Sequence, residues 1–162
     1  MFELISFHRF RDTPSVQFFD ITVQSSNARD LVFHDGPATS PHNAPGGAWQ
    51  FYLHPNQEDN LLAVSGGRTF YLVNFAWAYP FHEVRLEANS HILRLPPGTF
   101  HRSVSDPKGS LVLNQAVRTQ RATVDTEFRV YNSAAIPRLQ RLLTSGLRPQ
   151  RHGFADEWPL AA

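Results

Sequence analysis

Short apolar runs with many β-branched and aromatic residues recur along most of the chain. Such residues, often alternating with polar ones, favour extended strands over helices. The pattern predicts strands at residues 16–24, 29–34, 48–54, 60–65, 68–75, 82–87, 91–95, 101–105 and 110–118. Turn signals separate these runs, including Gly66-Gly67, which we interpret as a hairpin turn, and the segment DPKG at 106–109. Many short strands at regular spacing indicate an antiparallel sandwich or barrel.

One helix is predicted after the strands, at residues 137–145. Pro137 suits the first turn of a helix, and Gly146 suits its end. Three leucines would share one face of this helix: Leu139, Leu142 and Leu143. We expect the helix to pack on the outside of the strands or on a second subunit.

The chain of 162 residues is long enough for one domain with a hydrophobic core. We therefore expect a single domain over 1–162, with the core at about 16–118 and a tail at 149–162. In this tail, Phe154 and Trp158 could anchor the chain in a groove.

Composition excludes several classes of function. Fifteen basic residues against 14 acidic ones give a net charge of +1, which does not favour nucleic acid or an anionic membrane as a partner. The absence of cysteine excludes disulfide scaffolds, thiolate zinc sites and cysteine nucleophiles. Since no long apolar run and no signal-peptide pattern are present, the sequence predicts a cytoplasmic protein without a membrane span.

A turn rich in proline and glycine precedes one histidine. Pro96 and Pro97 restrict the backbone, Gly98 permits a turn conformation, and a strand begins at His101. Alternation along this strand puts Ser103 on the same face as His101. A polar inner face in a β-barrel indicates a lined cavity.

This turn, LPPGTFH, resembles the second conserved motif of the cupins, Pro-x-Gly-x-x-His between two jelly-roll strands. The first cupin motif is similar to YLHPNQEDNLLAVSGG: Tyr52 stands where its first histidine would be, His54 is the second, Asp59 the carboxylate and Gly66 the glycine. The resemblance covers roughly residues 48–118. It implies an all-β, cupin-type antiparallel jelly-roll barrel with the short C-terminal helix, most similar to the dTDP-4-dehydrorhamnose 3,5-epimerase group.

The resemblance implies two alternative chemistries. In a metal-dependent cupin, His54, His101 and either Asp59 or Glu58 would hold one divalent ion of iron, manganese, nickel or zinc. Tyr52 removes one customary ligand, so a site without metal stays open, and either histidine could also be a structural residue.

An epimerase-like site would use no metal. A histidine base, with His54 and His101 as candidates, removes a proton beside a ketone, and a tyrosine supplies one. In the family pattern, however, the clamping arginine is replaced by Phe51, the usual lysine by Asn60 and the tyrosine acid by Asn114. These replacements argue against true 3,5-epimerase activity.

The predicted cavity has six framing residues: Tyr52, His54, Asp59, His101, Ser103 and Asn114. Four strand arginines could contact a phosphate or sugar acid, or could simply be solvated: Arg68, Arg94, Arg102 and Arg118. Of these we include Arg94 among the expected ligand-binding residues.

The sequence thus predicts a cupin that binds a small molecule such as a sugar or sugar nucleotide, with a divergent catalytic site. One alternative is a metal-dependent cupin enzyme, of the isomerase, epimerase or dioxygenase type, acting on a small carbonyl or carbohydrate substrate. Another is a structural or regulatory subunit that binds a partner protein. The alternating aromatic residues of segment 75–81, together with the C-terminal helix, predict a homodimer.

Overall fold

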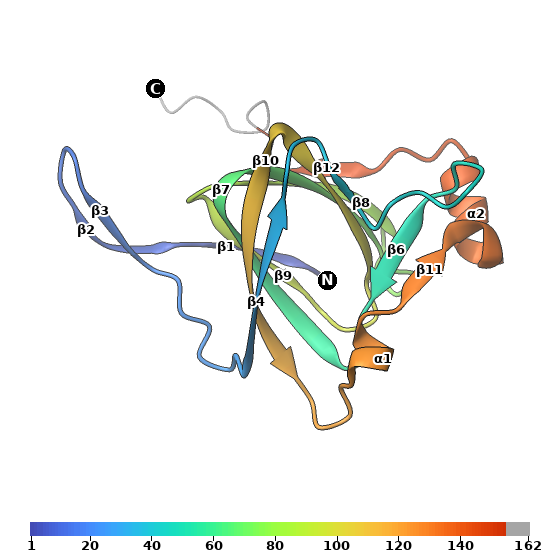
Figure 1. Cartoon of the computed structure of the whole chain (residues 1–162), viewed down its shortest axis with the longest axis horizontal. Helices are drawn as coiled ribbons and strands as arrows, with labels where there is room; N and C mark the ends of the chain where they lie inside the picture. Colours follow the sequence, from blue (N-terminus) through green and yellow to red (C-terminus); the bar gives the residue numbers. More distant parts are fainter. Residues whose placement is uncertain (155–162) are drawn as a thin grey trace.

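The computed structural model describes residues 1–154 and is mostly antiparallel β-sheet (Figure 1). The strands are β1 (Glu3–Ser6), β2 (His8–Asp12), β3 (Gln17–Asp20), β4 (Ala28–His34), β5 (Thr39–Ser40), β6 (Gln50–Leu53), β7 (Gln57–Val73), β8 (Phe81–Glu87), β9 (His91–Leu95), β10 (Phe100–Arg118), β11 (Val130–Asn132) and β12 (Gln150–His152). The helices are α1 (Val124–Glu127), the short 3-10 helix η1 (Ser133–Ala135) and α2 (Pro137–Thr144). Of the predicted tail, Trp158 lies outside the described residues, whereas Phe154 packs under Arg151.

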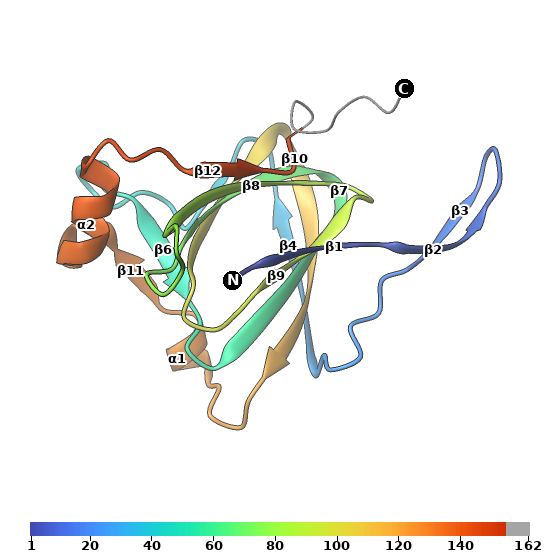
Figure 2. The same cartoon turned by 180° about the vertical axis from the view of Figure 1, so that it is seen from behind.

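Two long strands, β7 and β10, pair with each other and form the centre of the sheet. On one side β7 pairs with β8 and β9, and on the other β10 pairs with β4, β5 and β6. All pairings are antiparallel except that of β12 with β8. The sheet curves around an interior space, and the hairpin β2–β3 extends away from it (Figure 2).

The predicted hairpin turn at Gly66-Gly67 is wrong, because β7 continues through both glycines. Gly66 pairs with Ser110 of β10, and Gly67 pairs with Glu87 of β8. The segment 106–109 likewise does not end a strand, since it forms an irregularity within β10. Glycines with positive φ suit a bulge as well as a turn, so each pair of predicted neighbouring strands is one bent strand.

Several strand boundaries also differ from the sequence pattern. The predicted strand 16–24 is reduced to β3, which pairs with the unpredicted β2. The sheet extends beyond the predicted core, since β1 pairs with β9 and β11 pairs with β6. In the aromatic segment, residues 74–80 form turns and only Phe81 lies in a strand. Alternation therefore does not give that segment one continuous aromatic face.

The hydrophobic core lies between the inner faces of the curved sheet. Its largest cluster consists of Phe2, Leu61, Ala63, Phe70, Leu72, Val84, Leu86, Leu93, Leu95 and Val112. The predicted helix is confirmed as α2, whose Leu139 is fully buried against Phe51, Val73 and Phe81. No helix among residues 1–154 is long and apolar enough to cross a membrane.

We predict that the irregularity in β10 requires glycine at position 109. Gly109 has a φ of 82°, and a Cβ there would collide with the backbone carbonyl oxygen of His34. Gly109→Ala should lower the free energy of unfolding by about 2 to 5 kcal/mol in urea titrations. Gly46→Ala is the control, because Gly46 has a similar φ of 88° but no heavy atom near its Cβ position. Equal losses in the two variants would contradict this packing argument.

We also predict a pH-dependent contribution from Asp106. Two hydrogen bonds of 2.7 Å from Arg85 lower the pKa of the Asp106 carboxyl group. Because the pKa is lower in the folded state, the pair stabilises the fold above the ordinary aspartate pKa, and this contribution is lost as pH falls through the folded pKa. Asp106→Asn should cost no more than about 1 kcal/mol at pH 7, since the pair is partly exposed.

The difference between Asp106→Asn and the parent in urea unfolding should shrink between pH 7 and pH 3. The exposed Asp35→Asn serves as control and should show the same small difference at both pH values. A gap for Asp106→Asn that stays constant with pH would refute the assigned role of the ion pair.

Candidate functional site

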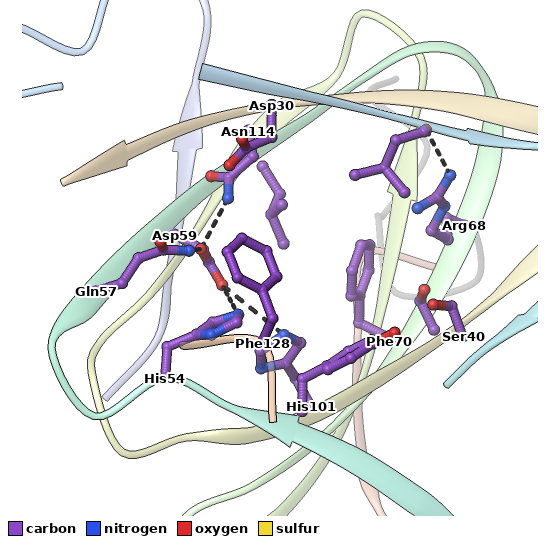
Figure 3. Close-up of a pocket in the computed structure, with 14 residues that line it drawn as sticks. Asp30, Ser40, His54, Gln57, Asp59, Arg68, Phe70, His101, Asn114 and Phe128 are labelled. Atoms are coloured by element: carbon purple, nitrogen blue, oxygen red, sulfur yellow. Dashed lines mark hydrogen bonds and ion pairs between the residues drawn. The ribbon is translucent and has the colours of Figure 1, made fainter. Parts of the chain in front are cut away.

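A cavity of about 180 Å³ lies inside the curved sheet (Figure 3). Its lining residues are Asp30, Val32, Ser40, Tyr52, His54, Gln57, Asp59, Leu61, Arg68, Phe70, His101, Ser103, Asn114 and Phe128. All six residues that the sequence predicted to frame a cavity are therefore at its wall. Arg94 is not, because its guanidinium hydrogen-bonds with Glu3 and Asn60 instead.

The Asp59 carboxylate lies at one end of the cavity between two histidines. It is only 3% exposed, and its Oδ2 lies 3.3 Å from Nε2 of His54 and 3.8 Å from Nε2 of His101. Asp59 comes from β7, His101 from β10, and His54 directly follows β6. Of the two predicted carboxylates, Asp59 thus joins the histidines, whereas Glu58 contacts Asn60 and Arg94.

Two amide side chains fix the Asp59 carboxylate. Gln57 Nε2 donates to Asp59 Oδ1 at 2.6 Å, and Asn114 Nδ2 donates to the same oxygen at 2.8 Å. Gln57 and Asp59 are two positions apart on β7, so both side chains reach the same face. With Oδ1 occupied by two donors, Oδ2 is the oxygen that faces the two imidazoles.

Backbone carbonyls orient both histidine rings. His54 Nδ1 contacts the carbonyl oxygen of Glu127, and His101 Nδ1 lies 3.1 Å from that of Thr99. Burial, followed by the charge of His54, lowers the pKa of His101, so this ring is neutral at pH 7. A neutral ring that donates from Nδ1 presents a lone pair at Nε2. The carbonyl contacts thus direct both Nε2 atoms toward Asp59, which the Nε2 of His101 faces as an acceptor.

The proline-rich turn positions His101 as the sequence predicts. Gly98 has a φ of 79° and donates its backbone N–H to the carbonyl of His54 at 2.9 Å. Thr99 is buried, and its hydroxyl donates to the carbonyl of Pro96. The turn therefore ties the two histidine-bearing segments together directly.

Helix α1 was not expected from the hydrophobic pattern. Thr123 caps it, and its buried Glu127 accepts hydrogen bonds from the backbone and side chain of Asn56. The next residue, Phe128, lines the cavity and lies edge-on to His54. A threonine cap followed by acidic residues in the first turn is a helix-start signal that could have revealed α1.

Tyr52, which replaces the first histidine of the cupin motif, also lines the cavity. Its ring centroid lies 6.5 Å from that of His54 and 6.0 Å from that of His101. It pairs with His101 in the register of β6 and β10. The phenol is therefore a neighbour of the Asp59 cluster and could donate to a molecule bound in the cavity.

Arg68 occupies the end of the cavity opposite the Asp59 cluster (Figure 3). It is 2% exposed and donates to the Ser110 hydroxyl, the Ser110 carbonyl and the Val32 carbonyl. Burial lowers the pKa of Arg68 to about 10, so the guanidinium remains charged at pH 7. The other two arginines lie outside the cavity wall, where Arg102 contacts Trp49 and Arg118 pairs with Asp30.

Comparison with known proteins gives matches at the level of structure only. The chain matches the sugar 3,4-ketoisomerase QdtA from Thermoanaerobacterium thermosaccharolyticum, in complex with TDP, with a TM-score of 0.59 and 12% identity over 90% of this chain and 97% of that one. It matches the Mycobacterium tuberculosis RmlC epimerase with a TM-score of 0.61 and 14% identity over 98% and 82% of the two chains. It also matches the Bacillus anthracis dTDP-4-dehydrorhamnose 3,5-epimerase, with TDP and PPi bound. Here the TM-score is 0.60 and the identity 13%, over 78% of this chain and 76% of that one.

The chain has the jelly-roll fold of the epimerase-like cupins. Both the predicted fold class and the predicted resemblance to this group are thereby confirmed. No family model matches the sequence, and no curated protein matches it. At identities of 12 to 14% the similarity establishes the cupin fold alone, so the chemistry must be argued from the site itself.

The cluster is compatible with two kinds of chemistry. Two imidazole nitrogens and a carboxylate oxygen can coordinate one divalent ion and leave positions open for a ligand. The same groups can also hold and transfer a proton without a metal.

Proposed function

We propose that this cupin holds a divalent metal ion at His54, Asp59 and His101 and binds a small sugar-derived or carbonyl-containing molecule beside it. The observation that carries this proposal is the convergence of three potential ligand atoms, all within 4.8 Å of one another. Among residues 1–154 no other group of histidine and acidic side chains meets the same criterion.

The hydrogen bonds that His54, Asp59 and His101 make with their other polar atoms support a bound metal ion rather than a proton shared within the cluster. Backbone carbonyls engage Nδ1 of both histidines, and two amides engage the other oxygen of Asp59. This is how residues around metal centres orient ligand side chains. Without a cation, a neutral His101 would direct its lone pair at the carboxylate, which is unfavourable.

In this proposal a bound metal would act as a Lewis acid toward a carbonyl or hydroxyl oxygen of the ligand. Gln57 and Asn114 would keep the Asp59 carboxylate in place, and Phe128 would restrict access of water from the α1 side. The Tyr52 hydroxyl would donate a hydrogen bond to the ligand. A cavity of about 180 Å³ favours a molecule no larger than a simple sugar in the interior.

A metal-free, isomerase-like enzyme is the second candidate. It is supported by the structural neighbours, whose names describe sugar ketoisomerases and epimerases. In this case His101 would take up a proton from the carbon beside a ketone, and Tyr52 would supply one, since their ring centroids lie 6.0 Å apart. The His54 ring fits this role less well because its Nε2 lies closer to Asp59 Oδ2, at 3.3 Å against 3.8 Å for His101.

We predict about one equivalent of iron, manganese, nickel or zinc in protein purified without a histidine tag or chelator, measured by elemental analysis. His101→Ala and Asp59→Asn should lose the metal, because each removes one of only three protein ligands. Gln57→Met should weaken metal affinity by about 10- to 100-fold, since it removes one of the two amide donors to Asp59 Oδ1. His8→Ala, which changes an exposed histidine, is the control.

Metal retained in both ligand variants would contradict the assignment of His101 and Asp59. If instead the parent neither contains nor takes up metal, the centre is refuted and the isomerase-like candidate stands. That candidate would then be tested by exchange of substrate hydrogen with deuterated solvent, using a 4-keto sugar nucleotide.

We further propose that the chain forms a homodimer through β4. Leu31 and Phe33 are 68% and 70% exposed on this strand, whose second edge pairs with no other strand among residues 1–154. An exposed apolar edge strand of this kind is a common pairing surface.

Light scattering should therefore give a mass of about twice 18.4 kDa for the parent. Leu31→Lys combined with Phe33→Lys should give the monomer mass, because charges on the paired edge oppose association. Val124→Lys, at another exposed apolar residue, should leave the dimer intact. A monomeric parent, or a dimer that tolerates both lysines, would argue against this interface.

A further inference from the structure

Arg68 carries a buried positive charge that no acidic residue of the described chain neutralises. Its three hydrogen bonds all go to neutral oxygens: the Ser110 hydroxyl and the carbonyls of Ser110 and Val32. These bonds use Nε and Nη2, and no hydrogen bond from Nη1 to another residue of 1–154 is present. Arg68 nevertheless lines the cavity, so Nη1 is available to a bound molecule.

An uncompensated charge in this position is expensive. Removing a charged group from water is unfavourable unless an opposite charge or enough hydrogen bonds replace the lost solvation. Burial is the cause that lowers the pKa of Arg68, and no acidic group counteracts it. We therefore expect the positive charge of Arg68 to have a role in binding a molecule in the cavity.

No hydrogen bond or ion pair joins Arg68 to an acidic side chain of residues 1–154, since Asp30 of the cavity wall pairs with Arg118, and a second polar group nearby is unsatisfied. His34, on the same face of β4 as Val32, is buried, and its Nδ1 has no hydrogen-bond partner. Burial first, and then repulsion from Arg68, lowers the pKa of His34 to about 4. This end of the interior is thus positively polarised and incompletely hydrogen-bonded.

Two serine hydroxyls line the cavity between its ends. Ser40 and Ser103 are paired across β5 and β10, and both contribute to the wall. Ser103 lies two residues from His101 and two residues from Ser105, which is the strand partner of Arg68. Both serines are therefore further polar groups that a ligand in this cavity can contact.

We propose that Arg68 is an anion subsite and that the ligand of this cavity is a small sugar-derived acid. The carboxylate of this ligand binds Nη1 of Arg68, and its hydroxyl or carbonyl oxygens face His54, Asp59 and His101. This inference deepens the proposed function and rests on it for the part of the ligand that faces the cluster. Nη1 can donate to one oxygen of such a carboxylate, and a carboxylate adds less volume than a phosphate group to a ligand that must fit a cavity of about 180 Å³.

The test compares glucuronate with glucose, two sugars of similar size that differ in charge, by calorimetric titration of the full chain. The parent should bind glucuronate more tightly than glucose, and a smaller preference should persist after chelation of metal because the charge of Arg68 remains. Arg68→Met should weaken glucuronate binding by about tenfold to hundredfold, so that glucuronate no longer binds more tightly than glucose. Metal uptake by Arg68→Met should equal that of the parent.

Arg102→Met is the matched control, because Arg102 is also a buried strand arginine, on β10, but lies outside the cavity wall. It should keep the preference for glucuronate. Arg68→Lys, which retains the charge, should keep part of the preference, and this distinguishes anion binding from a purely structural role. If Arg68→Met does not fold, the comparison of Arg68→Lys with the parent still provides the test.

Equal binding of glucuronate and glucose by the parent would overturn the subsite, as would a preference that survives Arg68→Met. Stronger binding of glucose 6-phosphate than of glucuronate would overturn the carboxylate assignment in favour of a phosphate. If the parent binds no metal but still prefers glucuronate to glucose, the metal centre alone is refuted. The two proposals therefore fail in different measurements.

Discussion

Burial of the Asp59 carboxylate is the constraint on which the site depends. A carboxylate that is removed from water costs several kcal/mol unless hydrogen bonds and opposite charge replace its hydration. Here Gln57 and Asn114 satisfy one oxygen, and the other faces His54 and His101. These partners come from β7, β10 and the end of β6. The carboxylate therefore obtains its hydrogen bonds only when these strands pair correctly, and its burial in turn favours that pairing.

The continuity of β7 and β10 gives the cavity its two ends. Asp59 and Arg68 are on the same strand, and His101 and Ser103 are on its neighbour, so the positions of the cluster and the arginine depend on the pairing of β7 with β10 and on the bend between them. Had Gly66 and Gly67 formed the hairpin turn that the sequence suggests, Arg68 would begin a separate strand. Positive-φ glycines at 66 and 109 instead let the strands bend around the interior.

Local signals in the sequence predicted the parts of the site that depend on local geometry. The turn before His101 and the inward face of the following strand follow from Pro96, Gly98 and simple alternation. Helix α1 was missed because its role depends on a contact between Glu127 and His54, which are 73 residues apart and share no pattern. Arg68 could be named as a candidate, but only the folded chain distinguishes it from Arg94, Arg102 and Arg118.

The two ends of the cavity have consequences for each other. With no ion bound, the negative charge of Asp59 and the positive charge of Arg68 oppose each other across the interior. A divalent ion at the Asp59 cluster would reverse the sign of that end, so that both ends would be positive. An uncharged sugar would then leave two unbalanced charges in a space of low polarity, whereas an anionic ligand would compensate both. Occupancy of the metal site and preference for an anion should thus reinforce one another.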